Sequence, residues 1–278
     1  MRKISLVSAI MLILSVIACG TPGTPAAGPA VPAAAQATPT SPENTIRFAY
    51  RNVSLVTPPF GSNKITAEQL ELREQLNPAD DVPSFIQIDI REPWDVADEN
   101  GLYSQVLVYP LADLVQTYPE AGDAAVKLQG IIKQSGEPLP GQLPFWPLQY
   151  FSGVIGAQLK SYGRPVLTAQ AQLLDFGNGH GIRYVTLLEQ QPPRVHRMEG
   201  LIYTYQGLTN DGLYYVSVIL PIDMPHEDAL RHDLENRAEL PVPDYAGIAQ
   251  RLNALAPDQF YLRLGDCDGL IKSLAVSP

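Results

Sequence analysis

The most constraining feature of this sequence is a series of strand-like runs in its middle, joined by short connections. The runs are residues 166–176, 182–190, 200–206 and 213–220. The first connection contains Asn178-Gly179 and the last contains Asp211-Gly212. Asn-Gly and Asp-Gly supply the positive φ angles that tight hairpin turns require. Four such runs in succession predict a four-strand antiparallel meander.

The segments around these runs predict further strands and several helices. Ile86, Ile88 and Ile90 alternate with polar residues, as in a half-buried strand, whereas Thr66 followed by Gln69 resembles the capping box of a helix. The predicted strands are residues 46–50, 86–90, 106–109 and 273–276, and the predicted helices are residues 66–76, 119–134, 226–239, 244–255 and one that begins at Asp258. This order predicts the α+β class, with an antiparallel sheet covered by helices.

The first 18 residues have the order of a secretory signal. Arg2 and Lys3 precede an apolar run that extends to Ala18. A transmembrane helix needs about 20 apolar residues, and this run is shorter and is followed by a polar, proline-rich stretch. We therefore expect residues 1–18 to be a signal peptide.

The end of this run, Val16-Ile17-Ala18-Cys19, resembles the lipobox of bacterial lipoproteins. In that family the signal is removed just before a cysteine that is then lipid-modified. Val16 and Ile17 are less usual at their positions, whereas the small Ala18 is typical. The resemblance implies lipid (palmitate among its acyl chains) on Cys19 and a membrane-attached place in the cell envelope, outside the cytoplasm. An ordinary secretory signal with an incidental cysteine is the alternative.

The segment after Cys19 has the composition of a tether. Residues 20–42 contain six prolines, no charged residue and no aromatic residue. Such a segment cannot bury enough apolar surface to form a core. In an extended polyproline conformation it reaches roughly 70 Å at most. We therefore expect three parts: a signal at residues 1–18, a lipidated and disordered tether at 19–42, and one globular domain at 43–278.

The charge balance disfavours two kinds of partner. The chain carries 19 Lys and Arg against 29 Asp and Glu, for a net charge of −10, and no basic cluster is present. Nucleic-acid binding and docking of a basic patch to anionic lipid are both disfavoured.

Other motifs favour structural interpretations. Cys267 lies between Asp266 and Asp268, whose charges should raise its thiol pKa, so we expect a packed structural cysteine.

The string 177–181 is glycine-rich, but it lacks the lysine and hydroxyl of a phosphate-binding loop. His226, Asp228 and His232 supply too few ligands on one helix face for a metal, and their role stays open. GxSxG and HExxH are absent from the sequence, so no catalytic residue, metal or cofactor is expected.

Two further resemblances concern the domain. The strings at 181–186, 203–209 and 211–217 are similar to a group of uncharacterised envelope lipoproteins, a likeness that covers most of the domain and implies no activity. The order of meander, helix and closing strand is similar to the PsbP-like α/β/α sandwich of photosystem accessory proteins. That likeness implies a binding or assembly role by analogy only.

One face of the meander is the candidate ligand site. If Asp211 and Gly212 form the turn, Gln206 lies opposite Ser217, and an apolar set from Leu201 to Leu220 faces the core. The opposite face then carries uncharged polar groups suited to a glycan or an extended peptide. The candidate residues are Gln170, Gln172, Tyr184, Thr186, Thr204, Gln206, Tyr215 and Ser217. The alternative is that helices cover this face or that it is merely solvated.

These features predict an envelope lipoprotein that acts as a binding or assembly module. Its partners would be the membrane, through lipid on Cys19, and an envelope protein, peptide or glycan. The alternatives are a hydrolase acting on an envelope polymer and a purely structural lipoprotein. An enzyme should show convergent ionisable groups in a deep pocket, and a binding module a groove or an exposed patch without them.

Overall fold

The computed structural model describes residues 45–58, 64–71, 83–91, 104–134, 139–141, 143–145, 164–189, 201–222, 244–260 and 262–278. The chain divides into two units, Met1–Thr40 and Ser41–Pro278, and every described residue belongs to the second. The expected signal, the expected tether with Cys19 and the whole of the expected helix at 226–239, with His226 and His232, lie outside the described residues. No described helix is both long enough and apolar enough to cross a membrane.

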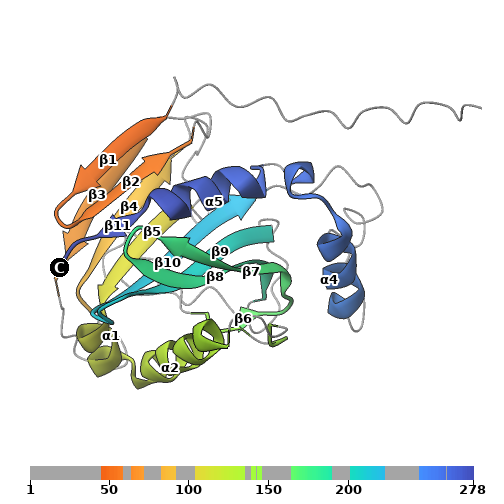
Figure 1. Ribbon diagram of the computed structural model, residues 1–278, viewed down its shortest axis with the longest axis horizontal. Helices are drawn as coiled ribbons and strands as arrows, with labels where there is room; N and C mark the ends of the chain where they lie inside the picture. The colour runs from red at the N-terminus through yellow and green to blue at the C-terminus, as the bar shows by residue number, and fades with distance from the viewer. Residues whose placement is uncertain are drawn as a thin grey trace, which may run out of the picture. The chain divides into compact units, whose positions relative to one another are not determined.

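A large antiparallel sheet forms the centre of the domain (Figure 1). Its strands follow the order β3-β4-β5-β10-β9-β8-β6, and β7 pairs with β8 beside this path. Their bounds are β3 Lys64–Leu70, β4 Phe85–Arg91, β5 Ser104–Pro110, β6 Arg164–Pro165, β7 Ala169–Phe176, β8 Gly179–Glu189, β9 Leu201–Thr209 and β10 Tyr214–Ile222. The meander β7-β8-β9-β10 and the α+β class are confirmed.

A second, smaller sheet joins segments from both ends of the described chain. Strands β1 (Ile46–Tyr50), β2 (Val53–Thr57) and β11 (Ala275–Val276) pair in the order β1-β2-β11. The Ser277 amide donates to the Asn52 carbonyl at 2.7 Å, and the Asn52 side-chain amide donates back to the Ser277 carbonyl at 2.7 Å.

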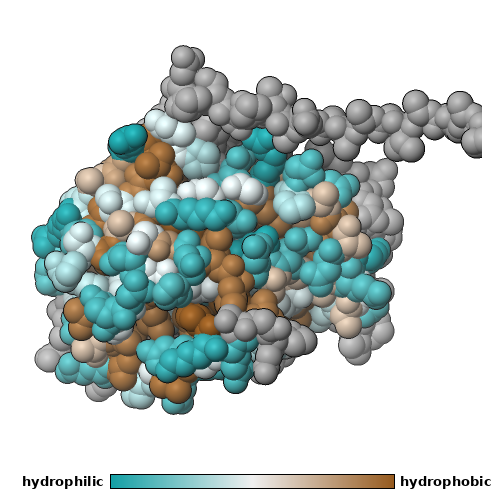
Figure 2. Space-filling view, viewed as in Figure 1, coloured by the Kyte–Doolittle hydropathy of each residue, from teal (hydrophilic) through white to brown (hydrophobic). Residues whose placement is uncertain are grey.

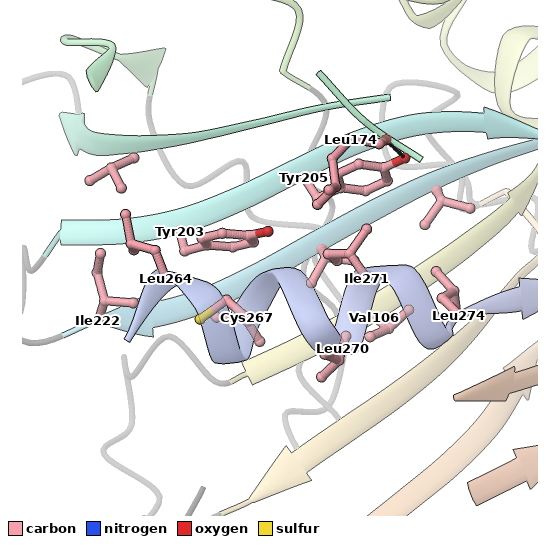
Figure 3. Packing of buried hydrophobic residues seen from close by; sticks show 14 of the residues in the cluster. Val106, Leu174, Tyr203, Tyr205, Ile222, Leu264, Cys267, Leu270, Ile271 and Leu274 are labelled. Atoms are coloured by element: carbon pink, nitrogen blue, oxygen red, sulfur yellow. Dashed lines mark hydrogen bonds between the residues drawn. The ribbon is translucent and has the colours of Figure 1, made fainter. Parts of the chain in front are cut away.

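Helices cover both faces of the large sheet. Helices α1 (Leu111–Thr117) and α2 (Pro119–Lys133) pack on one face, and α4 (Tyr245–Ala254), the 3-10 helix η4 (Pro257–Gln259) and α5 (Leu264–Ser273) contribute to the core of the other. We call these the α2 face and the α5 face. The α2 face buries Leu107, Tyr109, Ile182, Tyr184, Leu208 and Tyr215 against the helices. On the α5 face, Leu264, Cys267, Leu270 and Ile271 pack beside Tyr203 and Tyr205 (Figure 3).

Most predicted elements are present, and two predictions are wrong. The predicted helix at 66–76 is instead strand β3 over its first residues, because Thr66 pairs with Asp89 and the other residues follow the same register along β4. Sheet pairing overrides the local helix signal here. The last helix begins at Leu264 rather than Asp258, since Leu262 takes a positive φ of 60° that interrupts the helix.

The two glycine-containing turns are confirmed as hairpins. Gly212 takes a positive φ of 71°, and the Leu213 amide donates to Asp211 Oδ1 at 2.9 Å. At the other turn the Val276 amide donates to Asn178 Oδ1 at 2.9 Å. A Cβ on Gly177 would come within 2.7 Å of the Leu274 carbonyl oxygen. The glycine string therefore holds β11 in place, which explains its composition without an anion.

Candidate functional site

The polar face of the meander has the predicted register but not the predicted exposure. Gln206 lies opposite Ser217 and Tyr205 opposite Val218, as the turn at Asp211-Gly212 requires. However, Thr204, Gln206, Tyr215 and Ser217 each have a relative exposure of 0%. The expectation of an open polar surface at these four residues is therefore wrong.

These buried polar groups satisfy one another. Gln206 Nε2 donates to Thr204 Oγ1 at 2.9 Å and to Ser217 Oγ at 3.0 Å. The Tyr215 hydroxyl donates to Gln206 Oε1 at 2.9 Å, and Thr204 Oγ1 donates to the Val218 carbonyl at 2.9 Å. Buried polar groups with partners of this kind support the fold, because leaving any of them unpaired would cost about 1–3 kcal/mol. This hydrogen-bond network therefore stabilises the interior of the sheet and leaves these side chains unexposed to a ligand.

Gln170 and Gln172 do not extend the predicted face. The register between β7 and β8 shifts between Ala169 and Gln172, which marks a bulge in β7. Gln172 lies opposite Arg183, on the α5 face, and accepts a hydrogen bond from that guanidinium at 2.8 Å. Gln170 Nε2 donates to the Leu252 and Leu255 carbonyls, both at 2.9 Å, at the end of α4. Both glutamines thus bind the protein's own groups.

A buried ion pair lies beside these glutamines on the α5 face. Arg183 Nε is 3.3 Å from Asp268 Oδ1, and the Tyr203 hydroxyl donates to the same oxygen at 2.9 Å. Burial raises the pKa of Tyr203 well above its usual value, and the negative charge of Asp268 adds to the shift. Burial also raises the thiol pKa of Cys267, and the Asp268 and Asp266 charges raise it further. The expectation of a packed Cys267 is confirmed by its full burial.

An open groove lies next to the predicted face rather than on it. Its volume is about 620 Å³, and its walls come from α2, from the segments around Pro144 and Leu167, and from Tyr245 at the start of α4. The lining residues are Glu120, Asp123, Ala124, Lys127, Gly141, Leu143, Pro144, Phe145, Pro165, Val166, Leu167, Thr168, Tyr184 and Tyr245. Of the candidate residues, Tyr184 alone lines this groove.

Tyr184 and Thr186 hold two walls of the groove in place. The Tyr184 hydroxyl donates to the Pro144 carbonyl at 3.0 Å, and Thr186 Oγ1 donates to the Leu167 carbonyl at 2.6 Å. Both side chains are fully buried. Burial raises the pKa of Tyr184 well above its usual value, and the neighbouring Tyr215 adds to this shift. Tyr184 therefore stays protonated and keeps donating to the Pro144 wall at neutral pH.

The exposed rim of the groove carries three charged side chains from one helix. Glu120, Asp123 and Lys127 follow one another on α2 at the spacing of a single helical face. All three are exposed, and no ion pair joins them to one another within the described part of the chain. The groove therefore offers two carboxylates and one ammonium group to a ligand.

Other surface features of the described residues are less distinctive. Teal and brown residues are interspersed over the coloured part of the visible surface (Figure 2). The large hydrophobic side chains that are well exposed are Val126 at 69%, on α2, and Leu213 at 55%, in the connection before β10. Single exposed hydrophobic residues are normal on soluble surfaces. Within the described ranges, no three His, Cys, Asp or Glu side chains are grouped so as to hold a metal ion.

Sequence reasoning missed the groove because its parts come from separate segments. The helix predicted at 119–134 is present as α2, and residues at the spacing of a helical stripe, Ala121, Ala125, Leu128 and Ile131, are buried. Nothing in that periodicity shows that the neighbouring face of α2 meets residues 143–145 and 165–168. The composition of residues 136–149, rich in proline and glycine, was the available signal, and it predicts only a loop.

Comparisons with models of known protein families, with curated proteins and with solved structures find no match to this chain.

Proposed function

We propose that this protein is a lipid-anchored binding module of a bacterial cell envelope, and that its ligand occupies the groove beside α2. The observation that carries the proposal is the groove itself, with its volume of about 620 Å³. Small-molecule sites usually have volumes of about 300–1,000 Å³ and combine apolar walls with a few polar groups. The resemblance of residues 16–19 to a lipobox supports the anchor on Cys19.

Binding is favoured over hydrolysis by the placement of the ionisable groups. Glu120 and Asp123 project from the same wall of the groove, three residues apart on α2. A glycosidase needs two carboxyl groups that flank the scissile bond. The Tyr184 hydroxyl is engaged by Pro144 and is not available as a proton donor to a substrate. Among the described lining residues, the ionisable side chains thus do not converge from two sides on one substrate bond, as catalysis requires.

The proposal is tested by NMR on the full chain in detergent, with ¹³C-labelled alanine methyl groups. Ala124 lines the groove, whereas Ala112, on α1, is exposed and does not. Isolated envelope material is separated into polymer, lipid and peptide fractions, and each is added in turn. We expect one fraction to shift the Ala124 signal and leave the Ala112 signal unchanged. If no fraction shifts Ala124, the groove is not a ligand site and the proposal is wrong.

A further inference from the structure

The groove presents aromatic rings beside a charged rim. Phe145 and Tyr245 are half-buried lining residues, and Tyr184 is buried at the same site. Leu143 and Val166 add aliphatic surface to the walls. Aromatic faces attract the weakly positive C–H edges of a bound molecule. These walls suit a ligand with flat apolar faces rather than a flexible, fully solvated chain.

The rim combines hydrogen-bond acceptors and donors of both charges. Glu120 and Asp123 accept hydrogen bonds, Lys127 donates them, and the Thr168 hydroxyl can do both. The two carboxylates outnumber the single ammonium group, so the rim repels an anionic ligand, whereas a cationic ligand would leave Lys127 without a partner. A neutral molecule rich in hydroxyl groups satisfies all four side chains without such repulsion.

We infer that the groove binds a short saccharide, with sugar-ring faces against Phe145 and Tyr245 and hydroxyl groups at the α2 rim. This inference rests on the proposed function and names its ligand class. Sugar rings have apolar C–H faces and polar edges, which match the two kinds of surface that the groove combines. A tetrasaccharide of N-acetylglucosamine and maltotetraose test two different linkages and substituents.

The experiment titrates the full chain in detergent with each of these two saccharides, and with tetralysine and hexyl phosphate as charged probes. Binding is followed by calorimetry and by the Ala124 methyl signal. We expect at least one saccharide to bind. Asp123→Ala and Phe145→Ala should each weaken this binding about tenfold or more, as loss of a charge-assisted hydrogen bond or a stacking ring does. The melting temperature of each variant checks that it is folded, and Asp123→Asn gives a milder change at an exposed position.

Matched controls lie outside the groove. Lys133 is exposed at the end of α2, and Asp258 is exposed in η4. Lys133→Ala and Asp258→Ala should leave the saccharide affinity unchanged, whereas Lys127→Ala should lower it.

The remaining outcomes overturn the inference in distinguishable ways. Binding of tetralysine or hexyl phosphate with a shift of Ala124, and of no saccharide, would reject the ligand class and leave the groove as a binding site. Saccharide binding that neither shifts Ala124 nor is weakened by the groove variants would place the sugar elsewhere and reject the saccharide inference, whereas the groove proposal is decided by the Ala124 signal with the envelope fractions. If neither saccharide binds, the saccharide inference is wrong whatever the charged probes do.

Discussion

Tyr184 connects the interior of the domain with the groove through a single hydrogen bond. Its hydroxyl donates to the Pro144 carbonyl at 3.0 Å, while its ring is packed in the core of the α2 face. Tyr184→Phe keeps the ring and leaves that buried carbonyl without this donor. We expect the free energy of unfolding to fall by about 1–2 kcal/mol. Ligand affinity should also fall, because the Pro144 wall loses its support.

Tyr205→Phe is the matched control for this change. The Tyr205 hydroxyl donates to the Leu174 carbonyl at 3.0 Å on the α5 face, away from the groove residues (Figure 3). Urea unfolding should show a similar loss of stability for both variants, with reduced binding for Tyr184→Phe alone. Equal binding by the two variants would show that the hydrogen bond to Pro144 does not shape the groove.

For single residues of the β9–β10 hairpin, the sequence predicts which face of the sheet a side chain occupies. It does not predict what covers that face. The Asp211-Gly212 turn correctly placed Gln206 opposite Ser217, since strand parity follows from the turn. Burial of that face depends on tertiary packing, which includes α2 docking from a distant segment. Gln172 lies opposite Arg183 in the regular register that runs from the Asn178 turn, so it does not share the parity of Tyr184. The bulge between Ala169 and Gln172 then breaks the register before Gln170, and no turn residue announces that bulge.

At the scale of elements, Gln170 holds the end of α4 against β7. Its backbone φ is +53°, and its side-chain amide donates to the Leu252 and Leu255 carbonyls. Gln170→Ala loses both hydrogen bonds and keeps the unfavourable φ, so we expect a loss of about 1–3 kcal/mol. Gln170→Gly loses the same hydrogen bonds, but glycine adopts a positive φ without strain. This variant should therefore recover about 1 kcal/mol of the lost stability.

Thermal unfolding of the two variants measures this difference. Because Gln170 does not line the groove, ligand affinity should stay unchanged in both. A glycine variant no more stable than the alanine variant would show that the positive φ carries no strain.

Elements with a strong local signal were predicted best. The helix predicted at 244–255 is present as α4, and the Asp244 carboxylate caps its start by accepting a hydrogen bond from the Gly247 amide at 2.9 Å. The stripe of α2 likewise follows the helical period. Strand β3 was mistaken for a helix because its pairing with β4 is a tertiary contact that the local Thr66 and Gln69 signal does not contain.

At the scale of the whole molecule, buried tyrosines make stability depend on alkaline pH. Burial raises the pKa of Tyr184, Tyr203, Tyr205 and Tyr215 above the ordinary value near 10. The unfolded chain loses these protons first, so stability is fully present below about pH 10 and is lost as the pH rises further. The slope should approach about 5 kcal/mol per pH unit for four such groups.

Urea unfolding and tyrosinate absorbance, measured from about pH 8 to about pH 11, check this dependence. The four tyrosines should ionise only as the protein unfolds. Tyr215→Phe should reduce the slope by about 1.4 kcal/mol per pH unit. If the free energy of unfolding of Tyr215→Phe depended on pH as steeply as that of the unaltered protein, the raised pKa of Tyr215 would be contradicted.

The proposed anchor concerns the molecule as a whole and is tested by detergent partitioning. Cys19→Ala removes the cysteine of the lipobox-like string, so the chain should move from the detergent phase to the aqueous phase. Cys267→Ala is the control, because Cys267 is buried in the domain and should not affect partitioning. Recovery of both the unaltered chain and Cys19→Ala in the aqueous phase would reject lipidation.

The joining of β2 to α5 and β11 has a consequence for when the domain can fold. The Val56 amide donates to Ser273 Oγ at 2.8 Å across 217 positions of sequence, and Leu55 shares a core cluster with Leu270 and Leu274. During synthesis, β1 and β2 leave the ribosome long before these partners exist. The α5-face core therefore closes only after residues 264–276 have emerged, and folding that depends on such distant contacts is slow. For a protein exported as we propose, the α5-face core would therefore still be open while the earlier part of the chain is available for export.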